Sequence, residues 1–310
     1  MADLLYRLGI AILLPHNELM SLIRSAPHRY KVYQVPKRIP GQFRTIAQPA
    51  REVKTLQYWV MENLLNDFET HPAATAYRAG YSIADNAGPH RHGKFILKLD
   101  FKDFFPSLKA RDFKVFLKNS GVTLDEDTVE ALCRILFWRP RGTRDLRLSI
   151  GAPTSPMLSN VLMRDFDQRI AAFCAAHAVV YTRYADDLTF SAETSKRLAL
   201  VEQAVLNLVA RLKSPSLTVN EKKTVRVSKR EARRVTGLIL TNDEKVSLGR
   251  DQKRNIRAGV HHFAMGRLDS AEVLKLRGML NYVNSVEPAF LRRLRKKYGA
   301  STLKRLREGE

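Results

Sequence analysis

The sequence is poor in cysteine and in acidic residues. Of its 310 residues only Cys133 and Cys174 are cysteines, and they stand far apart in the chain. We therefore expect neither a disulfide framework nor a structural zinc site, and a reducing, cytoplasmic compartment. Acidic residues number 31 against 53 Lys and Arg, which gives a formal net charge of +22. Because the positive excess runs through the whole chain, we expect a polyanionic partner.

Long apolar runs and internal repeats are also missing. The longest early apolar run, residues 8–14, is interrupted by Gly9 and is too short to cross a bilayer. The residues before it lack the basic start and the cleavage site of a secretion signal, so we predict a short packing helix and no membrane partner. No repeat of roughly 20 to 50 residues occurs, which argues against a solenoid. Apolar residues make up 45% of the chain, enough for a buried core.

The apolar pattern predicts a mixture of helices and antiparallel strands. Residues 30–47 alternate on either side of a basic loop with Lys37 and Arg38 at its tip, as in a β-hairpin. Apolar residues from Val53 to Phe68 recur at helical spacing. Further segments are expected as a strand at 95–100, a helical stretch over 155–177, a hairpin over 179–192, a helix over 194–213, and short strands near 217–228, 234–240 and 245–248.

The last part of the chain, residues 250–310, is expected to be wholly helical. It contains 15 Lys or Arg and six Asp or Glu, and several of these cations lie off the apolar stripes. The segment is therefore a candidate clamp for a phosphate backbone. A merely solvated helical face is the ordinary alternative.

Two acidic stations stand at the ends of predicted strands. Asp100 ends the strand at 95–100, and Asp186 and Asp187 form the tip of the later hairpin. Either station alone is more often a helix cap or a polar turn. If the two strands are neighbours in one sheet, however, three carboxylates come together, and their repulsion is relieved by divalent cations.

Such a carboxylate site predicts nucleotidyl transfer. Two Mg²⁺ ions about 3.5–4 Å apart activate an attacking hydroxyl and stabilise the leaving oxygen of a phosphoryl displacement. Successive strand residues point to opposite faces, so we expect unequal roles, with Asp186 as a bridging ligand and Asp187 more peripheral.

These motifs resemble those of reverse transcriptases. YADD at 184–187 matches the signature turn of that family, and LDFKDFFPS at 99–107 matches its other acidic motif. Three more segments resemble family motifs and follow in the family's order: GQFRTIAQP at 41–49, GAPTSPMLSN at 151–160 and SLTVNEKKT at 216–224. The resemblance implies an α+β fold shaped like a right hand, with fingers, an antiparallel-sheet palm and an all-helical thumb. Fingers and palm are expected over residues 1–249 and the basic thumb over 250–310.

The resemblance also implies roles for single residues. Lys223 would protonate departing pyrophosphate, Arg44 would meet the triphosphate of the incoming dNTP, and Phe105 would exclude a 2′-hydroxyl. An electrostatic role for Lys223, a solubilising Arg44 and an ordinary core Phe105 are the alternatives. Position 150 is Ile where most relatives carry Gln, so the nucleotide contact of that Gln is not assigned to Ile150. The remaining positions matched to nucleotide binding are Phe101, Asp103, Phe104 and Gly151, and the positions matched to metal are Asp100, Phe101, Asp186 and Asp187.

Two short elements narrow the resemblance to retron reverse transcriptases. Asn86, Ala87 and His90 fit the N-A-x-x-H element of that group, and Val235, Thr236 and Gly237 fit its V-T-G triplet. RNA contacts are expected at both elements and, on the predicted thumb, at Lys253, Arg254 and Arg257. For Asn86 and His90, a buried hydrogen-bonding pair is an equally weighted alternative.

Membership of that group implies a specific reaction. The enzyme would copy its cognate structured noncoding RNA, start from a guanosine 2′-hydroxyl and leave a branched RNA–DNA product containing multicopy single-stranded DNA (msDNA). The resemblance further implies an antiphage defence system with an accessory effector protein.

Two other functions stay open. An intron-derived reverse transcriptase would share the catalytic motifs, but such enzymes commonly carry appendages that this length does not hold. A noncatalytic RNA-binding scaffold would need only the positive charge, although acids buried without metal would destabilise a pure binder.

Overall fold

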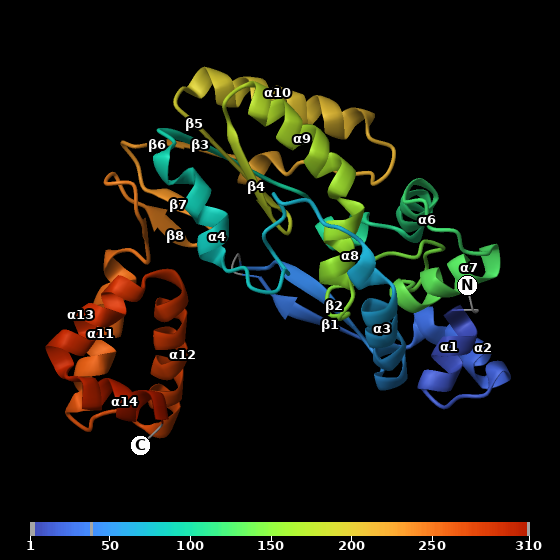
Figure 1. Cartoon of the computed structure of the whole chain (residues 1–310), viewed down its shortest axis with the longest axis horizontal. Helices are drawn as coiled ribbons and strands as arrows, with labels where there is room; N and C mark the ends of the chain where they lie inside the picture. The colour runs from blue at the N-terminus through green and yellow to red at the C-terminus, as the bar shows by residue number, and fades with distance from the viewer. Residues whose placement is uncertain (1–3, 38–39, 309–310) are drawn as a thin grey trace.

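The computed structural model describes residues 4–37 and 40–308, and in this part of the chain helices surround three antiparallel sheets (Figure 1). Arg38, expected at the tip of the first hairpin, lies outside the described residues. The helices are α1 (Leu4–Ala11), α2 (His16–Ser25), α3 (Arg51–Asn63), α4 (Ile83–Ala87), α5 (Phe104–Ser107), α6 (Ala110–Asn119), α7 (Glu126–Leu136), α8 (Ser155–Leu162), α9 (Arg164–Ala176), α10 (Ser195–Arg211), α11 (Arg250–Ala264), α12 (Ser270–Val286), α13 (Pro288–Tyr298) and α14 (Ala300–Glu308). The strands are β1 (Tyr30–Pro36), β2 (Phe43–Pro49), β3 (Phe95–Asp100), β4 (Val180–Tyr184), β5 (Asp187–Ala192), β6 (Val225–Ser228), β7 (Arg233–Val235), β8 (Leu238–Leu240) and β9 (Val246–Ser247).

The central sheet brings the two predicted acidic strands together. Its order is β4-β5-β3-β6, and all neighbouring strands run antiparallel. Helices α9 and α10 lie side by side over one face (Figure 1), with α10 packed on β3 and β5 and α9 on β4. β3 (FILKLD) is therefore largely apolar, whereas β5 (DLTFSA) alternates Leu188, Phe190 and Ala192 with the buried polar residues Thr189 and Ser191. The expectation that the strand at 95–100 neighbours the YADD hairpin is confirmed.

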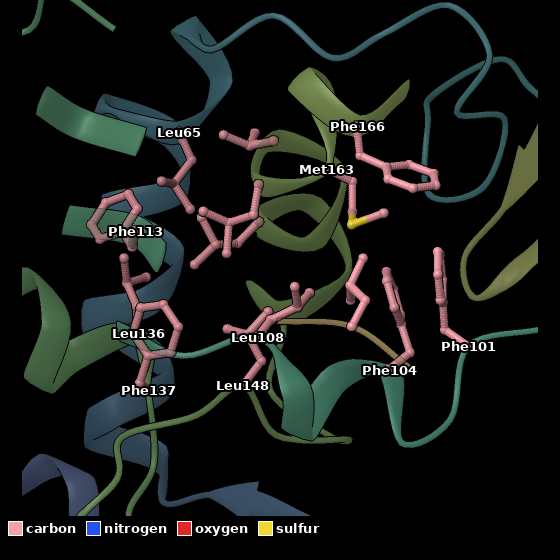
Figure 2. Packing of buried hydrophobic residues seen from close by; sticks show 14 of the residues in the cluster. Leu65, Phe101, Phe104, Leu108, Phe113, Leu136, Phe137, Leu148, Met163 and Phe166 are labelled. Atoms are coloured by element: carbon pink, nitrogen blue, oxygen red, sulfur yellow. The ribbon is translucent and has the colours of Figure 1, made fainter. Parts of the chain in front are cut away.

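A large aromatic core lies beside this sheet. Figure 2 shows Phe101, Phe104 and Phe166 packed around Met163, with Phe113 further along the same cluster. The rings of Phe101 and Phe104 stack with centroids 6.0 Å apart, and Phe166 meets Phe101 edge-on at 5.5 Å. Each fully buried side chain of this size stabilises the fold by about 1.5–3 kcal/mol. The segment that follows Asp100 is thereby fixed by its own phenylalanines.

A second core joins the C-terminal helices to the small sheet β7-β8-β9. Apolar stripes on α11 and α12, including Ile256, Val260 and Leu280, pack with Val235 and Leu238 of the sheet. In Figure 1 the sheet lies between the central sheet and the cluster of α11–α14. The helical character expected for 250–310 is confirmed over the described residues, whereas the boundary at 249/250 stays a prediction. The apolar cluster itself crosses that boundary.

Most expected elements are present, but four differ in extent. The helical stretch over 155–177 is divided at Met163 into α8 and α9, and the strand expected from 217 begins only at Val225. The strand expected near 234–240 is the hairpin of β7 and β8, and the helix expected to reach Phe68 ends at Asn63. Residues before Val225 form a loop and a 3₁₀ turn (Glu221–Lys223) because backbone bonds tie them to the acidic motif, with Asn220 N donating to Asp100 O at 2.7 Å. Both cysteines are buried free thiols. Among the described residues, no helix combines the length and apolarity needed to cross a membrane.

Candidate active site

The three predicted carboxylates meet at one end of the central sheet. Asp100 on β3 lies directly opposite Asp187 on β5, and Asp186 occupies the two-residue loop between β4 and β5. The side chain of Asp100 is 8% exposed. The convergence that the sequence predicted is therefore present.

The YADD loop has a fixed and unusual backbone. Ala185 has φ +57°, the left-handed region that glycine normally occupies. The carbonyl of Asp186 accepts a hydrogen bond from the N–H of Phe101 at 3.1 Å, which ties the loop to the first acidic motif. The loop therefore holds one defined conformation, with Asp186 next to Asp100.

Burial and neighbouring charges raise the pKa values of two of these carboxyl groups. Burial, followed by the charges of Asp100 and Asp187, raises the pKa of Asp186 from 3.8 to about 6. Burial is also the main cause that raises the pKa of Asp187, and nearby Lys98 opposes it. The site is thus short of positive charge.

Lys223 supplies part of that charge. Its Nζ donates to both carboxylate oxygens of Asp100 at 2.9 Å. Partial burial acts to lower the pKa of the ammonium, but the hydrogen bond to Asp100 and the charges of the three aspartates raise it above its ordinary value. A raised pKa keeps Lys223 protonated, which suits charge compensation better than proton donation near neutral pH.

The residues fit a divalent cation, with one condition. Within residues 4–37 and 40–308, no three His, Cys, Asp or Glu side chains are arranged to hold a metal ion as they stand. Both oxygens of Asp100 accept hydrogen bonds from Lys223 Nζ instead. Asp186 and Asp187 are carboxylates with raised pKa values, and hard cations such as Mg²⁺ prefer carboxylate oxygens. Once Lys223 releases Asp100, the donor set suits Mg²⁺.

The aromatic residue expected to contact the sugar lies beside the acids. Phe105 is half-buried, and its ring meets that of Tyr77 with centroids 6.3 Å apart. Tyr77 has φ +60° and is 47% exposed. Burial and the charge of Asp186 raise the pKa of its hydroxyl, while Arg44 lowers it, so Tyr77 stands within electrostatic reach of both.

Arg44 lies on β2, at an exposed position of the first hairpin. Its side chain forms no hydrogen bond or ion pair with the described residues, so the guanidinium is available to an anion. Lys37, at the end of β1, is likewise exposed.

Gly151, in the loop before α8, packs closely against β2 of the first hairpin. Its φ is +122°, and a Cβ would stand 3.1 Å from Ile46 Cγ2 and 3.2 Å from Ala47 O. The adjacent Ile150 accepts a hydrogen bond from Ala47 N at 2.9 Å. Glycine is therefore required here by close packing of two backbones.

The rings of two predicted nucleotide-binding residues face away from the site. Phe101 is 1% and Phe104 4% exposed, and both belong to the aromatic core (Figure 2). Only their backbone groups are available to a nucleotide or metal. Asp103 is exposed, with φ +46°, and its carbonyl accepts from Ser107 N at 2.9 Å.

The N-A-x-x-H element is buried, which corrects the expectation of direct RNA contact. Asn86 and His90 are both 0% exposed. His90 bonds Ser191 Oγ through Nδ1 and Thr182 Oγ1 through Nε2, both at 2.8 Å, and burial lowers its pKa to about 3. Asn86 Oδ1 accepts from Thr75 Oγ1 at 2.9 Å. The alternative of a buried hydrogen-bonding role is confirmed for both residues. Their partners, however, are Thr75, Ser191 and Thr182 rather than each other, and among the described residues Asn86 Nδ2 has no partner.

The V-T-G triplet forms the hairpin turn between β7 and β8. Val235 is fully buried, so it cannot touch RNA, while Thr236 and Gly237 form the turn with φ +47° and +85°. Thr236 Oγ1 donates to Ile83 O at 3.2 Å, which joins this turn to α4 and hence to the N-A-x-x-H element. A Cβ at Gly237 would meet nothing within 4 Å, so the tip faces open space.

The three predicted thumb cations differ in availability. Lys253 is paired with Glu287 at 2.7 Å and its side chain is only 16% exposed. Arg254 is 74% exposed and pairs with exposed Asp251 at 3.1 Å, while exposed Arg257 stacks over the ring of Phe290. Lys253 is therefore committed within the fold, and Arg254 and Arg257 present their charges to solvent.

Sequence reasoning missed Tyr77 and a buried pair behind the YADD loop. Arg183 and Asp167 form an ion pair at 2.6 Å with neither side chain exposed. A charged residue inside an apolar strand, directly before the acidic tip, was the available signal for Arg183. Nothing in the pattern distinguished Asp167 from other helix-surface acids or Tyr77 from ordinary exposed tyrosines.

Comparison with known proteins agrees with this geometry. Residues 35–240 match the family model described as reverse transcriptase (RNA-dependent DNA polymerase). The chain is 40% identical over 296 residues to Retron Ec83 reverse transcriptase of Escherichia coli, covering 95% of this chain and 94% of that protein. It is 36% identical to Retron Ec86 reverse transcriptase of the same organism, covering 91% and 86%, and 33% identical to Retron Mx65 reverse transcriptase of Myxococcus xanthus, covering 94% and 69%.

Solved structures with the same architecture are more distant in sequence. Telomerase from Candida tropicalis, in complex with a TWJ fragment of telomeric RNA, matches with a TM-score of 0.52 and 14% identity over 95% of this chain and 59% of that chain. Telomerase from Candida albicans matches with a TM-score of 0.51 and 14% identity, over 90% and 61%. The chain thus spans about three fifths of either telomerase chain. Likeness at this identity shows the fold alone, the α+β right-hand polymerase fold.

Proposed function

The chain belongs to the reverse transcriptase family, and from that premise we propose that it reverse transcribes the structured noncoding RNA of its own retron into msDNA. RNA-directed DNA polymerase activity follows from the family, and relatives over most of the chain are retron enzymes. The observation that carries the finer proposal is the joining of the two retron-type elements, through Thr236 and Ile83, on the same polypeptide as an intact acidic site.

For the chemical step we propose that Asp100, Asp186 and Asp187 bind two Mg²⁺ ions, with a backbone contribution from Phe101. When bound, the ions activate the attacking hydroxyl and stabilise the leaving oxygen in the in-line displacement. Asp186 and Asp100 would hold the ions where the new bond forms. Asp187, on the strand next to Asp100, would support them. The raised pKa of Asp186 supports this assignment, because burial first, and then the charges of Asp100 and Asp187, disfavour its ionised form, and a bound cation would offset both.

The remaining residues around the acids bind and orient the dNTP. Arg44 presents a guanidinium that has no partner among residues 4–37 and 40–308, and its fork suits triphosphate oxygens. The ring of Phe105 fills the space beneath the sugar of the dNTP. Gly151 and the backbone around Asp103 and Phe104 form the bottom of the nucleotide-binding site. With a cation on Asp100, the ammonium of Lys223 would be free to neutralise departing pyrophosphate, or to protonate it as the family resemblance implies.

For the RNA and the RNA–DNA product, we propose contacts through the tip of the V-T-G turn and through Arg254 and Arg257. These are the exposed members of the predicted set. The other predicted RNA-binding residues are buried or ion-paired, and they stabilise the elements that carry these contacts: Asn86, His90, Val235 and Lys253. Contacts between arginine side chains and the phosphate backbone make the affinity for RNA strongly dependent on salt concentration.

The biological setting is also part of the proposal. Priming from an RNA 2′-hydroxyl, an antiphage role, an accessory effector protein and a cytoplasmic location are carried over from the retron resemblance. The two buried free thiols are compatible with a reducing compartment.

The test is synthesis on the enzyme's own RNA. Purified protein is incubated with its cognate RNA, dNTPs and Mg²⁺ and without a DNA primer, and the product is treated with debranching enzyme and with RNase. The proposal expects DNA joined to RNA through a 2′,5′ linkage, and none with Asp186→Asn. Extension that occurs only on an added DNA primer would favour an intron-type enzyme, and binding without extension on any substrate would favour a noncatalytic scaffold.

A further inference from the structure

A fully buried ion pair lies directly behind the YADD loop. Arg183, on β4, donates from Nε to Asp167 Oδ1 at 2.8 Å and from Nη2 to Oδ2 at 2.6 Å, and both side chains are 0% exposed. This two-bond fork fixes the plane of the guanidinium. Tyr181 also donates to Oδ1 of this carboxylate at 2.7 Å, but both bonds of the fork run between Arg183 and Asp167 alone.

The third nitrogen of the guanidinium reaches the catalytic loop. Nη1 of Arg183 donates to Ala185 O at 3.0 Å and to Asn160 Oδ1 at 3.2 Å. Asn160 is itself held by donation from Nδ2 to Ala76 O at 2.8 Å. Since Phe101 N donates to Asp186 O, both carbonyls of the two-residue loop have a partner.

We propose that Arg183, oriented by Asp167, is a positioning residue that holds Ala185 in its left-handed conformation and thereby aims the carboxylate of Asp186. The proposal rests on the proposed role of Asp186 in metal binding. An alanine with φ +57° is strained, and such a conformation persists only where surrounding contacts determine it. Arg183 supplies such a contact, because its Nη1 donates to Ala185 O from a guanidinium that Asp167 holds in place.

A role in stability alone does not account for this arrangement. A buried ion pair is weak evidence for stability, because an apolar pair of similar volume is often equally stable in its place. An apolar pair cannot donate to Ala185 O. Replacing the pair as a whole therefore separates the two roles.

The experiment compares the wild type with the double variant Arg183→Met/Asp167→Leu and with Arg183→Lys, which keeps the charge but loses the fork. The control is Tyr181→Phe, which removes a hydrogen bond to the same Asp167 without touching the loop. Three quantities are measured: the melting temperature, the affinity for Mn²⁺ alone by electron paramagnetic resonance, and kcat and KM for single-nucleotide insertion.

The expected result is a melting temperature for the double variant close to that of the wild type, with Mn²⁺ affinity weakened about tenfold or more. The turnover number falls about 10- to 100-fold, since an error of about 1 Å in placing a reacting group costs on the order of 10²-fold. The KM for dNTP changes little. Arg183→Lys falls in the same direction, and Tyr181→Phe retains both Mn²⁺ affinity and turnover.

Unchanged Mn²⁺ affinity and turnover in a folded double variant would overturn the positioning role. If the double variant does not fold, unchanged Mn²⁺ affinity and turnover in Arg183→Lys would overturn the positioning role. Asp186→Asn is run in parallel: if it keeps Mn²⁺ binding and activity, the proposed metal site is wrong. If Asp186→Asn loses both while the Arg183 variants keep them, only the positioning role is wrong.

Discussion

Replacing Asp186 by Asn should stabilise the metal-free enzyme while abolishing its activity. Burial and the charges of Asp100 and Asp187 raise the pKa of Asp186 from 3.8 to about 6. A carboxyl whose pKa is higher in the folded than in the unfolded chain destabilises the folded state where it is ionised. The penalty is absent below pH 3.8, grows up to about pH 6 and is complete above it.

The size of the penalty follows from the shift. One pKa unit corresponds to about 1.4 kcal/mol, so the change from 3.8 to about 6 corresponds to about 3 kcal/mol at pH 8. Asn has nearly the same volume and no charge, so it removes the penalty. If all 310 residues unfold together, with an unfolding entropy of about 2 cal/mol/K per residue, the melting temperature rises by about 4–5 °C.

The assay is thermal unfolding in EDTA at two pH values. At pH 8 the variant should melt higher than the wild type, and at pH 5 the gain should fall to about half. Mg²⁺ should raise the melting temperature of the wild type more than that of the variant, because only the wild type gains compensation for the third carboxylate. The exposed Asp251→Asn serves as the control and should show no such pattern. A variant less stable than the wild type at pH 8, or a gain independent of pH, would refute the reasoning.

Three further variants test other parts of the proposal. Phe105→Ala should relax discrimination against ribonucleotides by about tenfold or more in kcat/KM, because the excluded 2′-hydroxyl gains room; unchanged discrimination in a single-nucleotide insertion assay would contradict the steric role. The double variant Arg254→Ala/Arg257→Ala should lower the slope of log affinity against log salt for RNA by about 2, and an unaltered slope would remove both from the RNA surface. His90→Ala should lower the free energy of unfolding by about 2–4 kcal/mol, since Ser191 and Thr182 lose their partner, while the folded fraction keeps its RNA affinity; a selective loss of RNA affinity would restore direct contact.

Much of the fold could be predicted because its periodicities are clear. The strand at 95–100 and the YADD hairpin are short apolar runs with their acids at the ends, so antiparallel pairing of two neighbours brings Asp100 opposite Asp187. The predicted 3.6-residue stripes on α11 and α12 face their common core for the same reason. Local pattern and tertiary packing agree in these elements.

The features that were missed or left open depend on contacts between distant segments. Burial of His90 was left open because its partners Thr182 and Ser191 come from β4 and β5, about a hundred positions away. Arg183 needs Asp167 from α9 to be buried at all. The pairing of Lys223 with Asp100 depends on the 3₁₀ turn that replaces the expected start of β6. No local pattern encodes such partners.

The continuous apolar packing between β7–β9 and α11–α14 determines how parts of this enzyme can be exchanged with those of a relative. A graft that begins at residue 250 would place foreign helices on Val235, Leu238 and Leu248, whose shapes were matched to the original ones. A graft that begins before β7 carries the sheet along with its helices. The contacts to be rebuilt are then those with α4, with Ile96 of β3, and with residues 91–93, which bond Arg233 and Glu244. Chimeras made to transfer RNA preference should therefore be joined near residue 230, where the chain is exposed.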